Sequence, residues 1–81
     1  MEKRLHLLYF AMLRESAGVE AEDFSTSANT AGELYSELKD CRGLSIHENE
    51  LRVAVNGEFA NLEDNLNDGD EIAFIPPVSG G

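Results

Sequence analysis

The sequence predicts an α+β fold in which one main helix covers one face of a mixed β-sheet. Residues 4–10 and 71–75 are apolar on both alternating faces, which is typical of strands at the centre of a sheet. Between them, residues 30–42 have the spacing of one amphipathic helix. With 81 residues, the chain is predicted to form one small domain.

The first third of the chain predicts a central strand, a short helix and a more exposed strand. In residues 4–10 the two faces are distinct: Leu5, Leu7 and Tyr9 share one, and His6, Leu8 and Phe10 share the other. Residues 11–17 can form a short helix that ends at Gly18, because glycine tolerates the left-handed conformation that ends helices. Residues 19–25 are rich in acids, with Ala21 and Phe24 spaced along them, and they predict a second strand.

The main helix has clear start and stop signals. Thr30 and Glu33 have the spacing of a capping box. The apolar positions recur on one face: Ala31, Leu34, Tyr35 and Leu38. Gly43 marks the end of the helix, and residues 45–50 are predicted to be irregular.

The last part of the chain predicts a hairpin and a final strand. Residues 51–55 alternate, and the Asn56-Gly57 pair that follows is the strongest two-residue hairpin signal. Residues 58–60 form the return strand, Leu62 and Leu66 close the bottom of the core, and residues 71–75 form the last strand. This order of elements is the β-grasp plan, the fold of ubiquitin. Since one helix covers only one sheet face, the other face is predicted to be an uncovered partner surface, with Phe59 and Ile75 as candidates.

Composition excludes several functions. Sixteen acids against six bases give a net charge of −10, which disfavours nucleic acid and anionic membranes and suits a basic protein partner. No apolar run is long enough to span a membrane, and we expect a cytoplasmic protein. Cys41 is the only cysteine, and His6 and His47 have no partner at metal-ligand spacing, so no disulfide and no metal site are predicted.

The sequence predicts a β-grasp body over residues 1–75 and an extended tail over residues 76–81. Pro76 and Pro77 end the last strand, because proline donates no ladder hydrogen bond. The tail has no charged side chain and ends in Gly80-Gly81, whose lack of Cβ lets the backbone enter a narrow channel. The terminal carboxylate can attack the α-phosphate of ATP to give an acyl adenylate, which a sulfur nucleophile converts into a thiocarboxylate.

The chain resembles the small, sulfur-carrying subunit of molybdopterin synthase over its whole length. The resemblance is carried by residues 7–14, Val55-Asn56, residues 66–71 and, most specifically, residues 72–81. It implies that an adenylyltransferase related to ubiquitin-activating enzymes uses ATP to adenylate Gly81, which becomes a 1-thioglycine. It also implies a heterotetramer with a large subunit, into which the tail inserts to deliver sulfur to cyclic pyranopterin monophosphate. No tightly bound cofactor is expected.

The resemblance assigns a role in chemistry to Gly81 alone, with Gly80 as its steric partner. Four residues are implied as tail contacts: Pro76, Pro77, Val78 and Ser79. Phe74 or Ile75 is implied as an anchor of the body on its partners, although alternation also fits Phe74 in the core. Because residues 72–81 contain no basic side chain, every other catalytic group is expected to come from the large subunit.

Three other functions fit the same residues. A related carrier could serve thiamine synthesis or tRNA thiolation, although the Pro76-Pro77-Val78-Ser79 spacer favours molybdopterin. A protein modifier would be joined through Gly81 to lysines, as ubiquitin is. An acidic β-grasp binding module would carry an inert tail.

Overall fold

The computed structural model, which describes residues 2–77, is a five-stranded mixed sheet covered on one face by a helix. In chain order the elements are β1 (Lys3–Tyr9), α1 (Met12–Ala17), β2 (Ala21–Thr26), α2 (Ala31–Arg42), the 3-10 helix η1 (Glu48–Glu50), β3 (Arg52–Val55), β4 (Glu58–Ala60) and β5 (Glu71–Ile75). The strand order is β2-β1-β5-β3-β4, and only β1 and β5 are parallel among these neighbours. The predicted β-grasp fold, with its first and last strands central, is confirmed.

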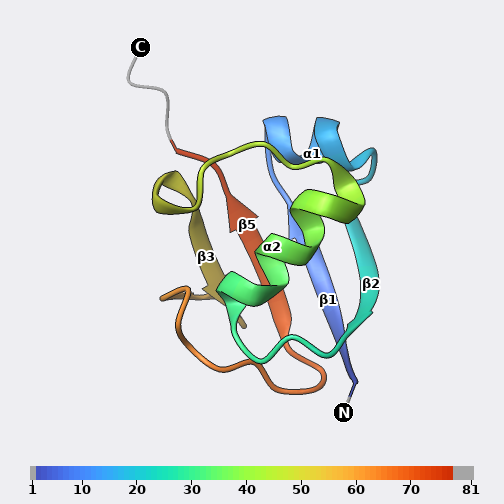
Figure 1. The fold of residues 1–81 in the computed structure, drawn as a ribbon, viewed down its shortest axis with the longest axis vertical. Coiled ribbons are helices and arrows are strands. Elements are labelled where there is room, and N and C mark those ends of the chain that lie inside the picture. The colour runs from blue at the N-terminus through green and yellow to red at the C-terminus, as the bar shows by residue number, and fades with distance from the viewer. Residues whose placement is uncertain (1, 78–81) are drawn as a thin grey trace.

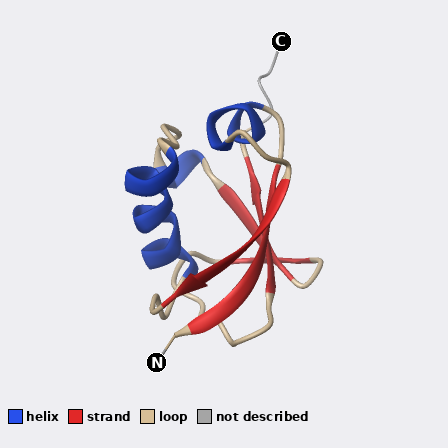
Figure 2. Cartoon of the chain, turned by 90° about the vertical axis from the view of Figure 1, so that its right-hand side faces the viewer, coloured by secondary structure: helices blue, strands red, loops and turns tan. Residues whose placement is uncertain are grey.

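The elements form two layers. Helix α2 lies across one face of the sheet, and within residues 2–77 no helix lies on the opposite face (Figures 1 and 2). Helix α1 sits at the sheet end where β1 finishes and β2 begins (Figure 1). Because β1 and β5 are parallel, β5 also finishes at that end. The chain therefore leaves β5 at the same end of the sheet as α1, on the side of η1 (Figure 1).

The start of α2 is capped by its own sequence and by a distant loop. The Thr30 hydroxyl accepts a hydrogen bond from the Glu33 N–H at 3.2 Å, as predicted, but the Glu33 carboxylate accepts from the Asn29 N–H instead of that of Thr30. The Leu62 carbonyl accepts from the Gly32 N–H at 2.8 Å, which satisfies one of the orphan donors of the first turn. A Cβ on Gly32 would lie 3.2 Å from that carbonyl oxygen, so glycine allows this close approach.

One hydrophobic core lies between α2 and the sheet. Its fully buried members come from both layers: Leu7, Ala31, Leu34, Tyr35, Leu38, Ile72 and Phe74. The loop after α2 belongs to the same core, since Tyr35 donates its buried hydroxyl to the Ile46 carbonyl at 2.9 Å. The predicted irregular segment 45–50 is wrong in part, because residues 48–50 form η1. His47 caps this turn, because its Nδ1 atom accepts a hydrogen bond from the Asn49 N–H. The polar composition of residues 45–50 hides this local signal in the sequence.

The Asn56-Gly57 turn locks β3 and β4 to the loop before β5. Both residues have positive φ, as a two-residue hairpin turn of this kind requires, so the predicted hairpin is confirmed. The Asn56 side chain donates to the Asp70 carboxylate at 3.0 Å and accepts from the Glu71 N–H at 2.9 Å. The Asp68 carboxylate also accepts from the Arg4 N–H at 2.7 Å, so the same loop is tied to β1. Two of the segments that carry the family resemblance, Val55-Asn56 and residues 66–71, therefore meet in space.

A partly buried ion pair joins β2 to the end of α2. Two guanidinium nitrogens of Arg42 donate to the Glu22 carboxylate at 3.0 and 2.8 Å, and the Tyr9 hydroxyl donates to it at 2.6 Å. The hydrogen bonds from Arg42 are the main reason that the pKa of Glu22 is lowered from its ordinary value of 4.5. Burial is the main reason that the pKa of Tyr9 is raised.

This ion pair predicts an acid-sensitive contribution to stability. Because the pKa of Glu22 is lower in the folded chain, the contribution is complete above the unfolded pKa and is lost as pH falls through the folded pKa. Arg42→Ala is expected to reduce the free energy of unfolding by about 1–2 kcal/mol at neutral pH. The difference from the unmodified chain should shrink as pH falls below 4.5. Urea unfolding across this range checks the prediction, with Arg14→Ala, the loss of an exposed cation, as control. An unchanged difference at acid pH would contradict it.

Candidate functional site

The base of the predicted tail is held in the middle of the sheet. Strand β5 pairs with β1 on one side and with β3 on the other, up to Ile75. Pro76, which was predicted to belong to the tail, is buried, whereas Pro77 is exposed. The Pro76 side chain therefore packs with the body and is not available as a partner contact. The predictions for Val78, Ser79, Gly80 and Gly81 lie outside the described residues.

The sheet face opposite α2 carries an apolar surface beside this exit. The strand registers place four side chains on that face, one from each of the strands β1, β3, β4 and β5: Leu8, Ala54, Phe59 and Ala73. Ile75 lies on the same face, opposite Arg52. We call these residues the open face. Phe59 is 72% exposed, and the Arg52 guanidinium lies 6.0 Å from the centre of its ring.

The prediction that Phe74 contacts a partner is wrong. Its side chain is completely buried on the face covered by α2, with its ring centre 5.6 Å from that of Tyr35 and 6.2 Å from that of Tyr9. Successive residues of a strand point to opposite faces, so the core position of Phe74 puts Ile75 on the open face. Phe59 and Ile75 thus remain the two predicted residues that lie on an uncovered surface.

Further exposed apolar side chains lie near the end of β1, and the prediction did not include them as contacts. Phe10, which directly follows β1, is 46% exposed, and Met12 of α1 is 53% exposed. The signal was present in the alternation of β1, which put Phe10 on the face of Leu8. Ala11, between Phe10 and Met12, has a φ of 51°. This conformation costs an L-residue energy and turns the chain sharply into α1.

The other half of the same face is polar. His6 of β1 shares a hydrogen bond of 2.9 Å between its Nδ1 atom and the Asp23 carboxylate of β2. This bond is the main reason that the pKa of Asp23 is lowered. The apolar part of the face is therefore bordered on one side by exposed charges, as partner surfaces often are.

The described residues at the tail base supply no catalytic group. Between Glu71 and Pro77 no side chain can ionise. In the described part of the chain, no group of three or more His, Cys, Asp or Glu side chains could hold a metal ion. None of the helices within residues 2–77 is long and apolar enough to cross a membrane. The geometry thus offers a docking face and a central strand that leads to the chain end.

The fold and this open face define the class of ubiquitin-like β-grasp proteins. The model of the ThiS family matches residues 7–81, and the chain belongs to the ThiS family. A relative from Haemophilus influenzae, the molybdopterin synthase sulfur carrier subunit, is 41% identical over 95% of this chain and 99% of its own length.

Two solved structures show the same fold. SAMP1 from Haloferax volcanii, a small archaeal modifier protein, is 28% identical, with a TM-score of 0.78 over 96% of this chain and 99% of its own. The protein–protein complex of subunits 1 and 2 of the molybdopterin-converting factor from Helicobacter pylori contains a chain that is 32% identical. It has a TM-score of 0.63 and matches over 100% of both chains.

Proposed function

We propose that this chain is the sulfur-carrier subunit of a molybdopterin synthase. The observation that carries the proposal is full-length similarity, at 41% identity, to a protein of that name, including the resemblance of residues 72–81. The structure supports the proposal, because it places the last strand at the centre of the sheet and beside an uncovered apolar face.

The proposed chemistry takes place at the carboxyl group of Gly81. This carboxylate attacks the α-phosphate of ATP on a ubiquitin-activating-type adenylyltransferase, and pyrophosphate leaves. A sulfur nucleophile then displaces AMP, and the product is the Gly81 thiocarboxylate. A thioacid is more acidic than an ordinary thiol, so its sulfur is anionic and nucleophilic at neutral pH. The thiocarboxylate sulfur is then delivered to cyclic pyranopterin monophosphate in a pocket of the large subunit.

The open face is the proposed docking surface for the large subunit in a heterotetramer. The Helicobacter pylori complex of subunits 1 and 2 supports a partner of this kind. Phe59 is the best candidate for an anchor, because a large aromatic ring that is almost free in the isolated chain gains the most from burial. Ile75 brings the same partner to the point where the chain leaves the sheet.

Phe59→Ala is expected to weaken binding to the large subunit without unfolding the chain. Loss of an aromatic anchor typically costs about 2 kcal/mol or more, which corresponds to about 30-fold in affinity. Stability should change by less than about 0.5 kcal/mol, because the ring is exposed. Titration calorimetry with the large subunit measures the first effect and thermal unfolding the second. Unchanged affinity would remove Phe59 from the interface.

The mass of the whole protein tests the proposed chemistry. After co-expression with an adenylyltransferase of the family and a sulfur source, we expect a species heavier by the replacement of one oxygen with sulfur. This thiocarboxylated protein, together with the large subunit, should convert cyclic pyranopterin monophosphate. A proven thiocarboxylate that fails in this reaction would point to a carrier for thiamine or tRNA instead. If no species with this increase in mass forms, the tail is inert and the proposal is wrong.

Similarity to SAMP1 from Haloferax volcanii favours protein modification as a second candidate function. In that case Gly81 would form an amide with lysines of other proteins. Digestion of cell extract should then release lysine peptides that carry the Gly-Gly remnant. A single unmodified band, with no such peptides, counts against this function and leaves sulfur transfer.

A further inference from the structure

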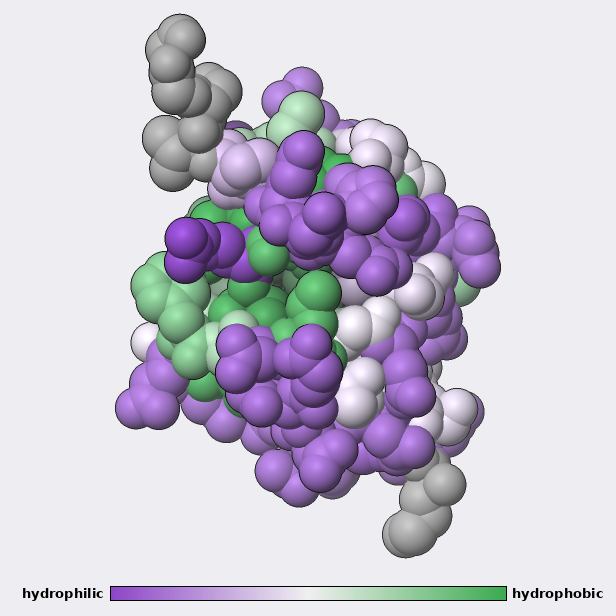
Figure 3. All heavy atoms as spheres, turned by 60° about the vertical axis from the view of Figure 1, so that its left-hand side comes forward, coloured by the Kyte–Doolittle hydropathy of each residue, from purple (hydrophilic) through white to green (hydrophobic). Residues whose placement is uncertain are grey.

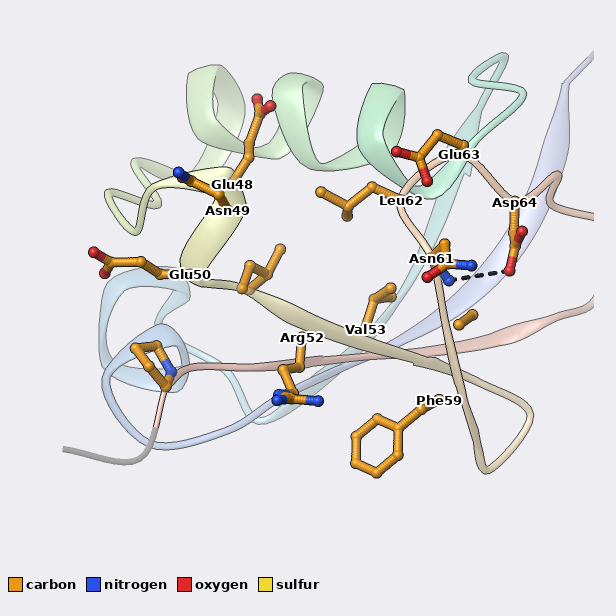
Figure 4. A pocket seen from close by; sticks show the side chains of 13 residues that line it. Glu48, Asn49, Glu50, Arg52, Val53, Phe59, Asn61, Leu62, Glu63 and Asp64 are labelled. Atoms are coloured by element: carbon orange, nitrogen blue, oxygen red, sulfur yellow. Dashed lines mark hydrogen bonds between the residues drawn. The ribbon is translucent and has the colours of Figure 1, made fainter. Parts of the chain in front are cut away.

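A groove runs along the sheet edge where β3 extends past β4. Pairing between these strands ends at Val53 and Ala60. After Ala60 the chain turns away toward α2, where the Leu62 carbonyl accepts from the Gly32 N–H. The resulting space between η1 and residues 61–64 has a volume of about 880 Å³, and Figure 4 shows the side chains that line it.

The groove has an apolar floor and an acidic rim. The floor is formed by four side chains: Leu51, Val53, Ala60 and Leu62. Four carboxylates also line it: Glu48, Glu50, Glu63 and Asp64. Figure 3 shows apolar surface between polar borders on this side of the molecule.

The rim charges are not all equally available. The Glu48 carboxylate accepts from the Ser36 hydroxyl at 3.3 Å, and that of Asp64 accepts from the Asn61 N–H at 3.0 Å. Glu50 and Glu63 are exposed and come from opposite sides of the groove, one from η1 and one from the loop after β4 (Figure 4). Arg52 is the only cation among the lining residues, and its guanidinium lies over the Phe59 ring on the open face. The groove therefore attracts positive charge.

We propose that this groove binds an extended segment of a partner protein in which apolar side chains alternate with lysine or arginine. The apolar side chains would cover the floor, and the cations would lie against Glu50 and Glu63. An extended segment suits the groove because its successive side chains alternate between two sides, so that they can reach the apolar floor and the acidic rim in turn. This surface goes beyond the docking face of the proposed function, since a partner on the open face leaves the apolar floor of the groove free.

Charge separates this occupant from two others. A second copy of the chain carries a net charge of −10 and would be repelled by the rim. The chain's own residues 78–81 contain no base, so they cannot pair with Glu50 or Glu63. Pro77 lines one end of the groove and Phe59 borders it, so a bound segment would lie beside the exit of the tail.

The test uses the full chain labelled with ¹⁵N and a capped peptide of sequence Lys-Leu-Lys-Leu-Lys. We expect saturable chemical-shift changes confined to the amides of residues 48–53 and 59–64. A Lys-Ser-Lys-Ser-Lys peptide tests the floor, and a Glu-Leu-Glu-Leu-Glu peptide tests the rim. Each control peptide should bind at least about ten-fold more weakly, since loss of the apolar contacts or of the ion pairs costs about 1.4 kcal/mol or more. Equal binding of either control peptide would overturn the proposal.

Matched charge reversals separate the groove from general acidity. Glu50→Lys with Glu63→Lys is expected to weaken binding of the first peptide by about ten-fold or more. Glu15→Lys with Glu20→Lys changes the net charge equally on exposed residues near α1 and should have little effect. Equal losses in both pairs, or shift changes spread over all acidic surfaces, would show non-specific attraction and no site. The affinity of the Glu50→Lys, Glu63→Lys variant for the large subunit reports separately on the proposed function, because that binding depends on the open face.

Discussion

Deletion of Gly81 is expected to abolish sulfur transfer while the folded body remains intact. The deletion moves the terminal carboxyl group back by about 3.3–3.6 Å along an extended chain. A displacement of even about 1 Å in a reacting group can cost about 100-fold in rate, so the loss should be at least that large. Formation of the thiocarboxylate, followed by the mass of the intact protein, measures the effect.

Thermal unfolding of the same variant is the control for structure. The core lies between α2 and the sheet and ends with β5, so removal of one residue four positions beyond Pro77 should leave the melting temperature nearly unchanged. Asp40→Asn, on the exposed side of α2, controls for handling and should keep full activity. Retained sulfur transfer without Gly81 would refute the assigned role, and a large fall in stability would show that the chain end packs on the body.

Phe74→Ala is expected to cause a larger loss of stability than Phe59→Ala or Arg42→Ala. Its ring is completely buried between Tyr9 and Tyr35, and replacing a buried phenylalanine with alanine typically costs about 3–5 kcal/mol. A domain of this size has about 5–10 kcal/mol in total, so the variant should be partly unfolded at physiological temperature. Urea unfolding of the purified variant measures the loss.

Phe59→Ala is the matched control, because it is the same chemical change at an exposed site. The two variants should separate two properties, with stability lost at Phe74 and partner affinity lost at Phe59. A small change in the free energy of unfolding of Phe74→Ala would mean that the core can collapse around the missing ring, and it would contradict the tight packing described here.

Most of the fold could be predicted because local signals and long-range pairing agree. The two-faced apolar pattern of residues 4–10 and 71–75 identified the central strands, and Asn56-Gly57 identified the hairpin. The same pattern could not say whether Phe74 or Ile75 faces α2, because both are apolar and alternation is symmetric. Only the packing of Tyr35 against Phe74 decides between the faces.

The groove could not be predicted from the sequence, for a different reason. It arises because β4 stops at Ala60 and the following loop is held by the first turn of α2, through the close approach at Gly32. No local pattern in residues 61–64 reports a contact with a glycine thirty residues earlier in the chain. Burial of Pro76 could not be predicted either. A proline next to a strand indicates only that the strand ends, and whether its ring is buried depends on residues distant in the sequence.

The central position of β5 also determines how the body responds to mechanical load. A partner that draws in the chain end pulls on β5 lengthwise, and β5 is hydrogen-bonded to β1 and β3 along both of its edges. A pull along the axis of β5 loads the ladders to both neighbours in shear, so the bonds on its two edges share the force, whereas the edge strand β4 has a neighbour on one side only. Under such a load the body would move as one rigid unit.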